Sequence, residues 1–157
     1  MGGMDWGVRL PVPLLIFFMM RILNDNAYLK LWVDGHSPIL FVQLKSEFFS
    51  LVNALEVYTM MNIKPIKSLA STHKELYLLL DVSDAKCHEI ENLIKYFEHT
   101  LTRKIKTTFR YISVVKSKDQ ERLSIRGNSQ VPVGVFATFF EALGTINDRR
   151  NTEYVLN

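Results

Sequence analysis

A short apolar run followed by an amphipathic helix constrains the fold of this chain more than any other feature of its sequence. Residues 76–80 are all apolar and stop at Asp81, a pattern typical of a strand buried on both faces. The apolar residues that follow are spaced three and four apart, as one buried helical stripe requires: Ile90, Leu93, Ile94, Phe97, Leu101 and Ile105. A buried strand that leads into such a helix predicts an α/β layer fold.

The composition places the chain among globular domains. With 157 residues it is long enough to bury one core, and 48% hydrophobic with 22% charged residues excludes a disordered chain. The net charge of +3 does not by itself indicate a nucleic-acid or membrane partner. Because Cys87 is the one cysteine, an intramolecular disulfide and a cysteine-based zinc cluster are excluded, and we expect a reducing, cytoplasmic location.

Residues 10–20 are apolar and uncharged but too short to span a membrane, which takes about 20 apolar residues. Pro11 and Pro13 also interrupt a helix there. We interpret residues 1–23 as an N-terminal extension, which is either a start-site artefact, with translation beginning at Met19 or Met20, or a short hydrophobic segment. A signal peptide is the least favoured reading, because no small-residue cleavage site follows the apolar run.

Alternating apolar and polar residues predict a strand from Ala27 to Asp34, with residues 39–44 returning as a second, antiparallel strand after a turn at Gly35. A helix capped by Ser46 is expected to end at Asn62. Because proline breaks helices, Pro65 predicts that residues 63–74 form a connection.

The last third of the chain supplies two more strands and a short helix. Residues 108–115 predict a buried strand, residues 116–128 a loop with a helical turn, and residues 131–136 an edge strand. Thr138 and Glu141 have the spacing of a capping box, which starts a short helix, and the residues from Asn147 onward predict a loose tail.

The predicted element order is β-β-α-β-α-β-β-α. This is one α/β domain over residues 24–147, with a mixed sheet of about five strands, helices packed on it, and a tail at residues 148–157.

Three stretches resemble a known family: Leu80-Asp81-Val82-Ser83, the strand at residues 111–115, and the ending VGVFATFFEAL at residues 133–143. The chain is similar there to small uncharacterised bacterial STAS-like proteins, which share the fold of the anti-sigma-factor antagonists. The resemblance covers residues 24–147. It implies a single-domain STAS-like fold and a non-enzymatic, regulatory module that binds a protein partner or a small ligand.

Anti-sigma-factor antagonists switch by phosphorylation of a serine in an Asp-Ser-Ser/Thr-Gly turn after the central strand. Residues 84–89 read DAKCHE here, and no serine or threonine occurs from Ala85 to His99. Ser83 is the nearby hydroxyl, and we expect it to cap a helix. The sequence therefore predicts that the phosphoserine switch is missing.

Few residues indicate chemistry. Asp81 ends a buried strand, where α/β sheets place ligand-binding groups, although a turn-capping role is the preferred interpretation. Cys87 lies where a helix dipole can lower a thiol pKa, and His88 and Glu91 share a helical face, but an ordinary thiol and a solvated face explain them. The candidate ligand or partner surface comprises Asp81, Ser83, Asp84, Cys87 and His88. We expect no catalytic residue, metal or cofactor, and keep a small enzyme using Asp81, Cys87 or His88 as an alternative.

Basic residues are concentrated between Lys95 and Arg126, where nine of them stand against three acidic ones. The candidate basic surface comprises Arg103, Lys104, Lys106, Arg122 and Arg126. This excess predicts, as an alternative function, a binder of nucleic acid or another anionic surface. Solubility and the favourable placement of cations at a helix C-terminus explain it more simply, so neither nucleic acid nor membrane is the expected partner, while a homodimer is left open.

Overall fold

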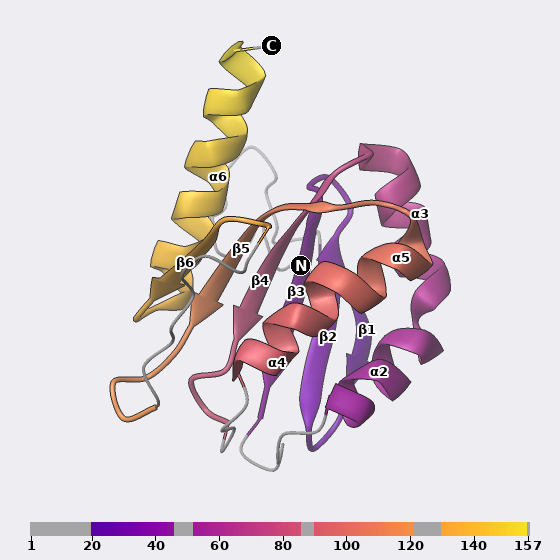
Figure 1. The fold of residues 1–157 in the computed structure, drawn as a ribbon, viewed down its shortest axis with the longest axis vertical. Helices are drawn as coiled ribbons and strands as arrows, with labels where there is room; N and C mark the ends of the chain where they lie inside the picture. The colour runs from indigo at the N-terminus through magenta and orange to yellow at the C-terminus, as the bar shows by residue number, and fades with distance from the viewer. Residues whose placement is uncertain (1–19, 46–51, 86–89, 121–129, 157) are drawn as a thin grey trace, which may run out of the picture.

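The computed structural model describes residues 20–45, 52–85, 90–120 and 130–156 of the chain. These residues form a six-stranded mixed sheet with helices on both faces (Figure 1), as the predicted α/β class requires. Within these four ranges, every helix is too short or too polar to cross a membrane.

The strands lie in the sheet in the order in which they occur along the chain. They are β1 (Met20–Asp25), β2 (Leu29–Asp34), β3 (Ile39–Leu44), β4 (Leu76–Asp81), β5 (Phe109–Val115) and β6 (Val133–Phe136). The first three pair antiparallel, and β3 to β6 run parallel. β4 is central and entirely buried, which confirms the prediction from its apolar run.

The antiparallel part differs from the prediction at its start. The sheet has one strand more than the expected five, because residues 20–25, partly assigned to the extension, pair with β2. The strand expected from Ala27 begins at Leu29, since the Asn26 side chain accepts hydrogen bonds from the Tyr28 and Leu29 amides and holds residues 26–28 in a turn. The predicted pairing of β2 with β3 is confirmed, with Val33 opposite Leu40 next to the turn.

The first crossover contains two helices, α2 (Val52–Met61) and α3 (Ile63–His73), so the prediction of a connection over residues 63–74 is wrong. Pro65 is tolerated because it lies in the first turn of α3, where an amide has no partner within the helix. The buried residues Ile66, Leu69 and Ala70 then give α3 its apolar stripe. The predicted cap at Ser46 lies outside the described residues.

The second crossover is one continuous helical stretch made of α4 (Ile90–Lys95), the π-helical segment η1 (Tyr96–Leu101) and α5 (Thr102–Ile105). All six residues of the predicted stripe are buried. The wider π turn also buries Tyr96, whose hydroxyl lies 2.5 Å from the Thr59 hydroxyl of α2. This polar contact joins the two crossovers on one face of the sheet.

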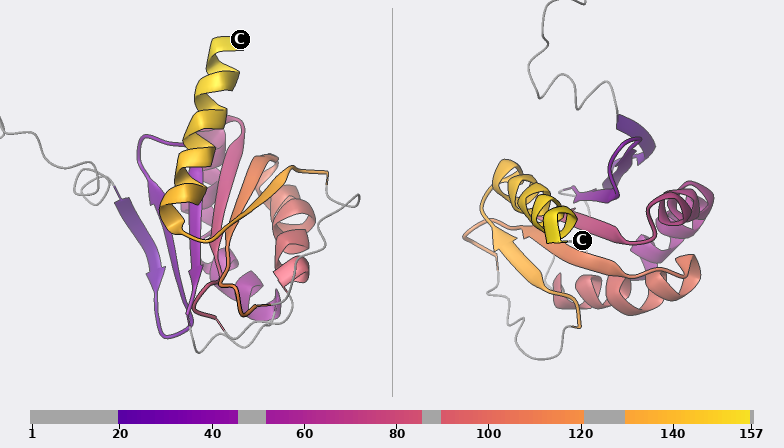
Figure 2. Two further views of the ribbon diagram at one scale, coloured as in Figure 1. Left: turned by 90° about the vertical axis from the view of Figure 1, so that its left-hand side faces the viewer. Right: turned by 90° about the horizontal axis from the view of Figure 1, so that it is seen from above.

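The opposite face is covered by α6 (Phe139–Leu156), as the two views in Figure 2 show. The Thr138 hydroxyl accepts a hydrogen bond from the Glu141 amide at 3.2 Å, which is the predicted cap. The loose tail predicted from Asn147 onward is wrong, because α6 continues to Leu156. No proline interrupts it, and Arg149 lies 3.9 Å from the centroid of the Tyr111 ring.

α6 also buries a side chain that the alternation of β2 placed on the more polar face. Trp32 is buried, with its ring stacked on Phe41 of β3 at 5.1 Å and on Phe139 of α6 at 6.3 Å between centroids. A second core therefore lies under α6, separate from the larger one under α2 to α5.

Candidate ligand-binding site

Three residues of the predicted ligand or partner surface, Asp81, Ser83 and Asp84, lie at the carboxyl end of β4. Asp81 ends β4, and its Oδ1 accepts hydrogen bonds from the Ser83 amide at 3.0 Å and the Ser83 hydroxyl at 2.6 Å. The two side chains thus close a turn after the strand, and both are explained by it. Asp84 is exposed next to this turn. Cys87 and His88 lie outside the described residues, as do the residues that precede α4.

Gln120, which sequence reasoning missed, braces the same turn. Its Nε2 donates to the carbonyl oxygens of Val82 at 2.5 Å and Ala85 at 3.0 Å, while its Oε1 accepts from the Ser117 amide at 2.8 Å. No periodicity or spacing pattern marks a lone glutamine in a loop. These hydrogen bonds join the loop after β5 to the turn after β4.

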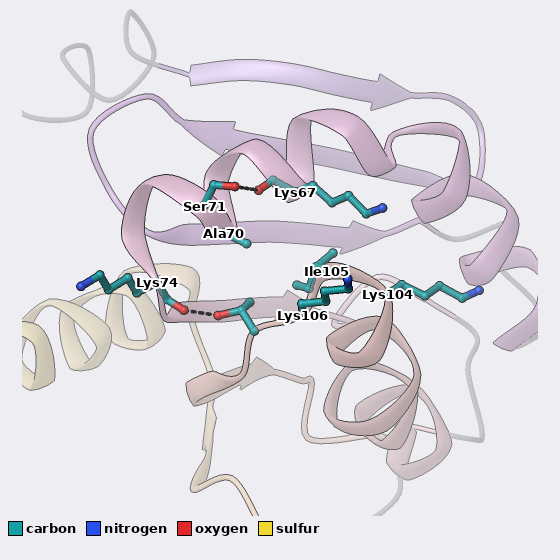
Figure 3. Close-up of a pocket in the computed structure, with 8 residues that line it drawn as sticks. Lys67, Ala70, Ser71, Lys74, Lys104, Ile105 and Lys106 are labelled. Atoms are coloured by element: carbon teal, nitrogen blue, oxygen red, sulfur yellow. Dashed lines mark hydrogen bonds between the residues drawn. The ribbon is translucent and has the colours of Figure 1, made fainter.

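An open cleft of about 590 Å³ lies near the amino-terminal ends of β4 and β5, between the end of α3 and the end of α5. Its lining residues come from these two helix ends (Figure 3): Lys67, Ala70, Ser71, Lys74, Lys104, Ile105, Lys106 and Thr107. We call it the lysine cleft, because half of these side chains are lysines.

The geometry of the lysine cleft follows from how the two helices end. Lys74 and Lys106 adopt φ angles of 63° and 56°, in the left-handed region that glycine usually occupies after a helix. Their amides donate to the carbonyl oxygens of Ala70 and Thr102, which completes each last turn. The Thr107 hydroxyl donates to the Lys74 carbonyl oxygen and joins the two ends.

The lysine cleft carries four positive charges, and its described lining holds no acidic residue. Lys67, Lys74, Lys104 and Lys106 are all exposed. Asp25 pairs with Lys45 and Glu75 pairs with Arg110, outside the lining of the cleft, and no described carboxylate lines it. The cleft is therefore a site of one sign of charge, which attracts anions.

Only part of the predicted basic surface takes part. Lys104 and Lys106 line the lysine cleft, whereas the Arg103 Nε donates to the His99 carbonyl oxygen at 3.0 Å on the helix surface. Arg122 and Arg126 lie outside the described residues.

The sequence missed Lys67 and Lys74 because they fall in the segment interpreted as a connection. A usable signal was present, since residues 67, 70, 71 and 74 have the spacing of one helical face.

Within the described ranges, no group of three or more His, Cys, Asp or Glu side chains is arranged to hold a metal ion.

Comparisons with protein-family models, with curated proteins and with solved structures gave no match to this chain.

Proposed function

We propose that this chain is a non-enzymatic, regulatory module that binds a small ligand in the lysine cleft. The observation that carries the proposal is the cleft itself, whose volume of about 590 Å³ is in the range of small-molecule sites. Two helix ends form it, and their polar side chains surround the apolar Ala70 and Ile105. Six of the eight lining side chains are polar, so the cleft offers mainly charge and hydrogen-bond donors to a ligand.

A binding role, rather than a catalytic one, is supported by the chemistry of the lining. Among the described residues that line the cleft there is no carboxylate, imidazole or thiol to act as a general acid or base beside the lysines. The Ser71 hydroxyl donates to the Lys67 carbonyl oxygen at 3.0 Å, and the Thr107 hydroxyl donates to that of Lys74. These hydroxyls act as structural groups, and the lysines provide charge.

The proposal includes a STAS-like fold. It is supported by the resemblance over residues 24–147 and by the order of elements from β2 to α6, in which helical crossovers join β3 to β4 and β4 to β5. The resemblance supports the fold by analogy only. The proposed binding role depends on the cleft.

Regulation through a phosphorylated serine is not part of the proposal. The Ser83 hydroxyl is bound to the Asp81 carboxylate, so a phosphate there would place a dianion against an anion. A bound ligand is the proposed signal in its place. The alternative of a nucleic-acid or anionic-surface binder through the basic segment 95–126 stays a prediction, because Arg122 and Arg126 lie outside the described residues.

A thermal-shift screen of the full chain against neutral and charged small molecules tests the proposal. A ligand present at about a hundredfold excess over its Kd stabilises a protein by about 2.7 kcal/mol, which corresponds to a Tm rise of roughly 5–10 °C in a domain of this size. The matched variants are Ser71→Trp, which fills the cleft, and Ser68→Trp, which adds the same side chain at an exposed position of α3 outside it.

We expect at least one compound to raise the Tm of the unchanged chain and of Ser68→Trp, but not that of Ser71→Trp. Mass spectrometry after incubation should recover the compound unaltered. The proposal fails if no compound binds, if binding survives Ser71→Trp, or if the bound compound is chemically converted.

A further inference from the structure

We propose that the ligand of the lysine cleft is a soluble, phosphate-bearing anion with at least two phosphoryl groups. This inference rests on the proposed function and names the chemical class of the ligand. Its basis is the juxtaposition of Lys67 and Lys74 from α3 with Lys104 and Lys106 from the end of the second crossover. An ammonium group is a compact charge with three donors, well suited to phosphate oxygens.

The negative ends of the two helix dipoles offset only a small part of the positive charge of the four lysines. Each of the two helix C-termini carries roughly half a negative elementary charge, so the pair offsets about one of the four lysine charges. Lys67 also lies six residues before the end of α3, beyond the last turn in which the dipole acts. A net charge of about +3 is therefore left for a ligand.

Two backbone conformations in the cleft also support an anionic ligand. Lys74 and Lys106 both occupy the left-handed region, where an L side chain is strained and glycine is not. Glycine at these two positions would remove the strain but also two ammonium groups. Lysine at both places is explained if the charge is needed for binding.

The lysine side chains spread along the lysine cleft instead of meeting at one point. In Figure 3 the side chains of Lys67 and Lys104 extend toward the same side, Lys74 extends toward the opposite side, and Lys106 lies between them. A single phosphate would reach only part of this row. An anion with two or more linked phosphoryl groups matches the extended arrangement, and the volume of about 590 Å³ suits a small molecule.

Calorimetric titration of the full chain with inorganic pyrophosphate, at 50 and 150 mM NaCl, tests the proposal. The first variant, Lys74→Gly/Lys106→Gly, removes two charges from the cleft and also relieves the backbone strain, so it should fold. The second, Lys67→Gln/Lys104→Gln, removes two charges from exposed helical positions. The control, Lys95→Gln/Lys118→Gln, removes the same charge from exposed lysines that do not line the cleft.

We expect pyrophosphate to bind, orthophosphate to bind at least tenfold more weakly, and each cleft variant to lose at least tenfold in affinity. The control should stay within about twofold, and a Tm of Lys74→Gly/Lys106→Gly at or above that of the unchanged chain shows that the loss is not caused by unfolding. Equal affinity in the cleft variants and the control, or no binding at 50 mM NaCl, overturns the proposal.

A second arm distinguishes the source of the phosphate. The unchanged chain is mixed with phosphatidylcholine vesicles that contain a phosphoinositide. The fraction of it that sediments with the vesicles should not exceed the fraction of the Lys67→Gln/Lys104→Gln variant that does so. Capture of the unchanged chain by these vesicles without pyrophosphate binding would overturn a soluble ligand in favour of a lipid headgroup.

If pyrophosphate fails but a compound from the thermal-shift screen still requires the open cleft, the phosphate inference is wrong and the proposed function stands. If Ser71→Trp also has no effect on any ligand, both are wrong.

Discussion

Replacing Gly134 with alanine tests the packing of β6 against β5. A Cβ at this position would overlap the Tyr111 hydroxyl oxygen and lie 2.8 and 2.9 Å from two carbons of the Phe136 ring. The Tyr111 side chain has little room to withdraw, because it is 4% exposed and the Arg149 guanidinium lies over its ring. Something must move to admit the methyl group.

The cost can be worked from two opposing effects. Overpacking a tight contact costs typically 1–3 kcal/mol. Replacing glycine where its backbone is ordinary recovers about 0.4–1 kcal/mol, because the unfolded chain loses freedom. We therefore expect Gly134→Ala to lower the free energy of unfolding by about 1–2 kcal/mol, or the Tm by about 2–8 °C.

Urea denaturation of four chains measures this: the unchanged chain, Gly134→Ala, Tyr111→Phe and the double variant. Tyr111→Phe removes the hydroxyl that the new methyl group meets most closely. The double variant should therefore lose about 1 kcal/mol less free energy of unfolding than the two single variants lose together. Relief should be partial, because the Phe136 contacts persist.

Gly144→Ala is the matched control, since a Cβ on this α6 residue meets nothing within 4 Å. It should stabilise the chain by about 0.5–1 kcal/mol. The packing argument is refuted if Gly134→Ala is as stable as the unchanged chain, or if removal of the Tyr111 hydroxyl brings no recovery.

Three further predictions concern single side chains. Thr138→Ala should lower the free energy of unfolding by about 1 kcal/mol in urea, and Thr138→Ser should not, because either hydroxyl can accept the bond from the Glu141 amide; equal losses would contradict the cap. Ser83→Asp should destabilise more than Ser83→Ala, because the new carboxylate would replace a hydroxyl 2.6 Å from Asp81 Oδ1; the reverse order in thermal unfolding would exclude this contact. Partial burial and then Arg150 hold the pKa of His73 below its usual 6.5, against the opposing effect of Asp34, so protonation favours the unfolded chain and stability should fall as the pH drops through about 6.5. His73→Gln should flatten that dependence between about pH 7 and pH 5, and an unchanged slope would show that His73 does not cause it.

The sequence alone determined the elements whose signals are local. Residues 76–80 predicted a doubly buried strand because an apolar run leaves no face for water, and the six-residue stripe predicted the face that packs on it. Thr138 marked a helix start because a hydroxyl at that spacing satisfies a free amide. These features depend on neighbours within a few positions along the chain.

Tertiary structure decided the elements for which local signals were misleading. Pro65 suggested a break, yet α3 forms because its first turn tolerates proline and its buried stripe packs against the sheet. The residues after Asn147 suggested a tail, yet α6 continues through them, with Arg149 packed on Tyr111 of β5. Packing against the sheet supplies what weak helix propensity does not.

The lysine cleft belongs wholly to the tertiary structure. Lys67 and Lys74 lie some thirty residues before Lys104 and Lys106 along the chain. Because β4 and β5 pair in parallel, their amino-terminal ends lie side by side. The helix that precedes each strand ends there too. The sequence showed an excess of basic residues but not which of them share a surface, because that depends on strand pairing between distant segments.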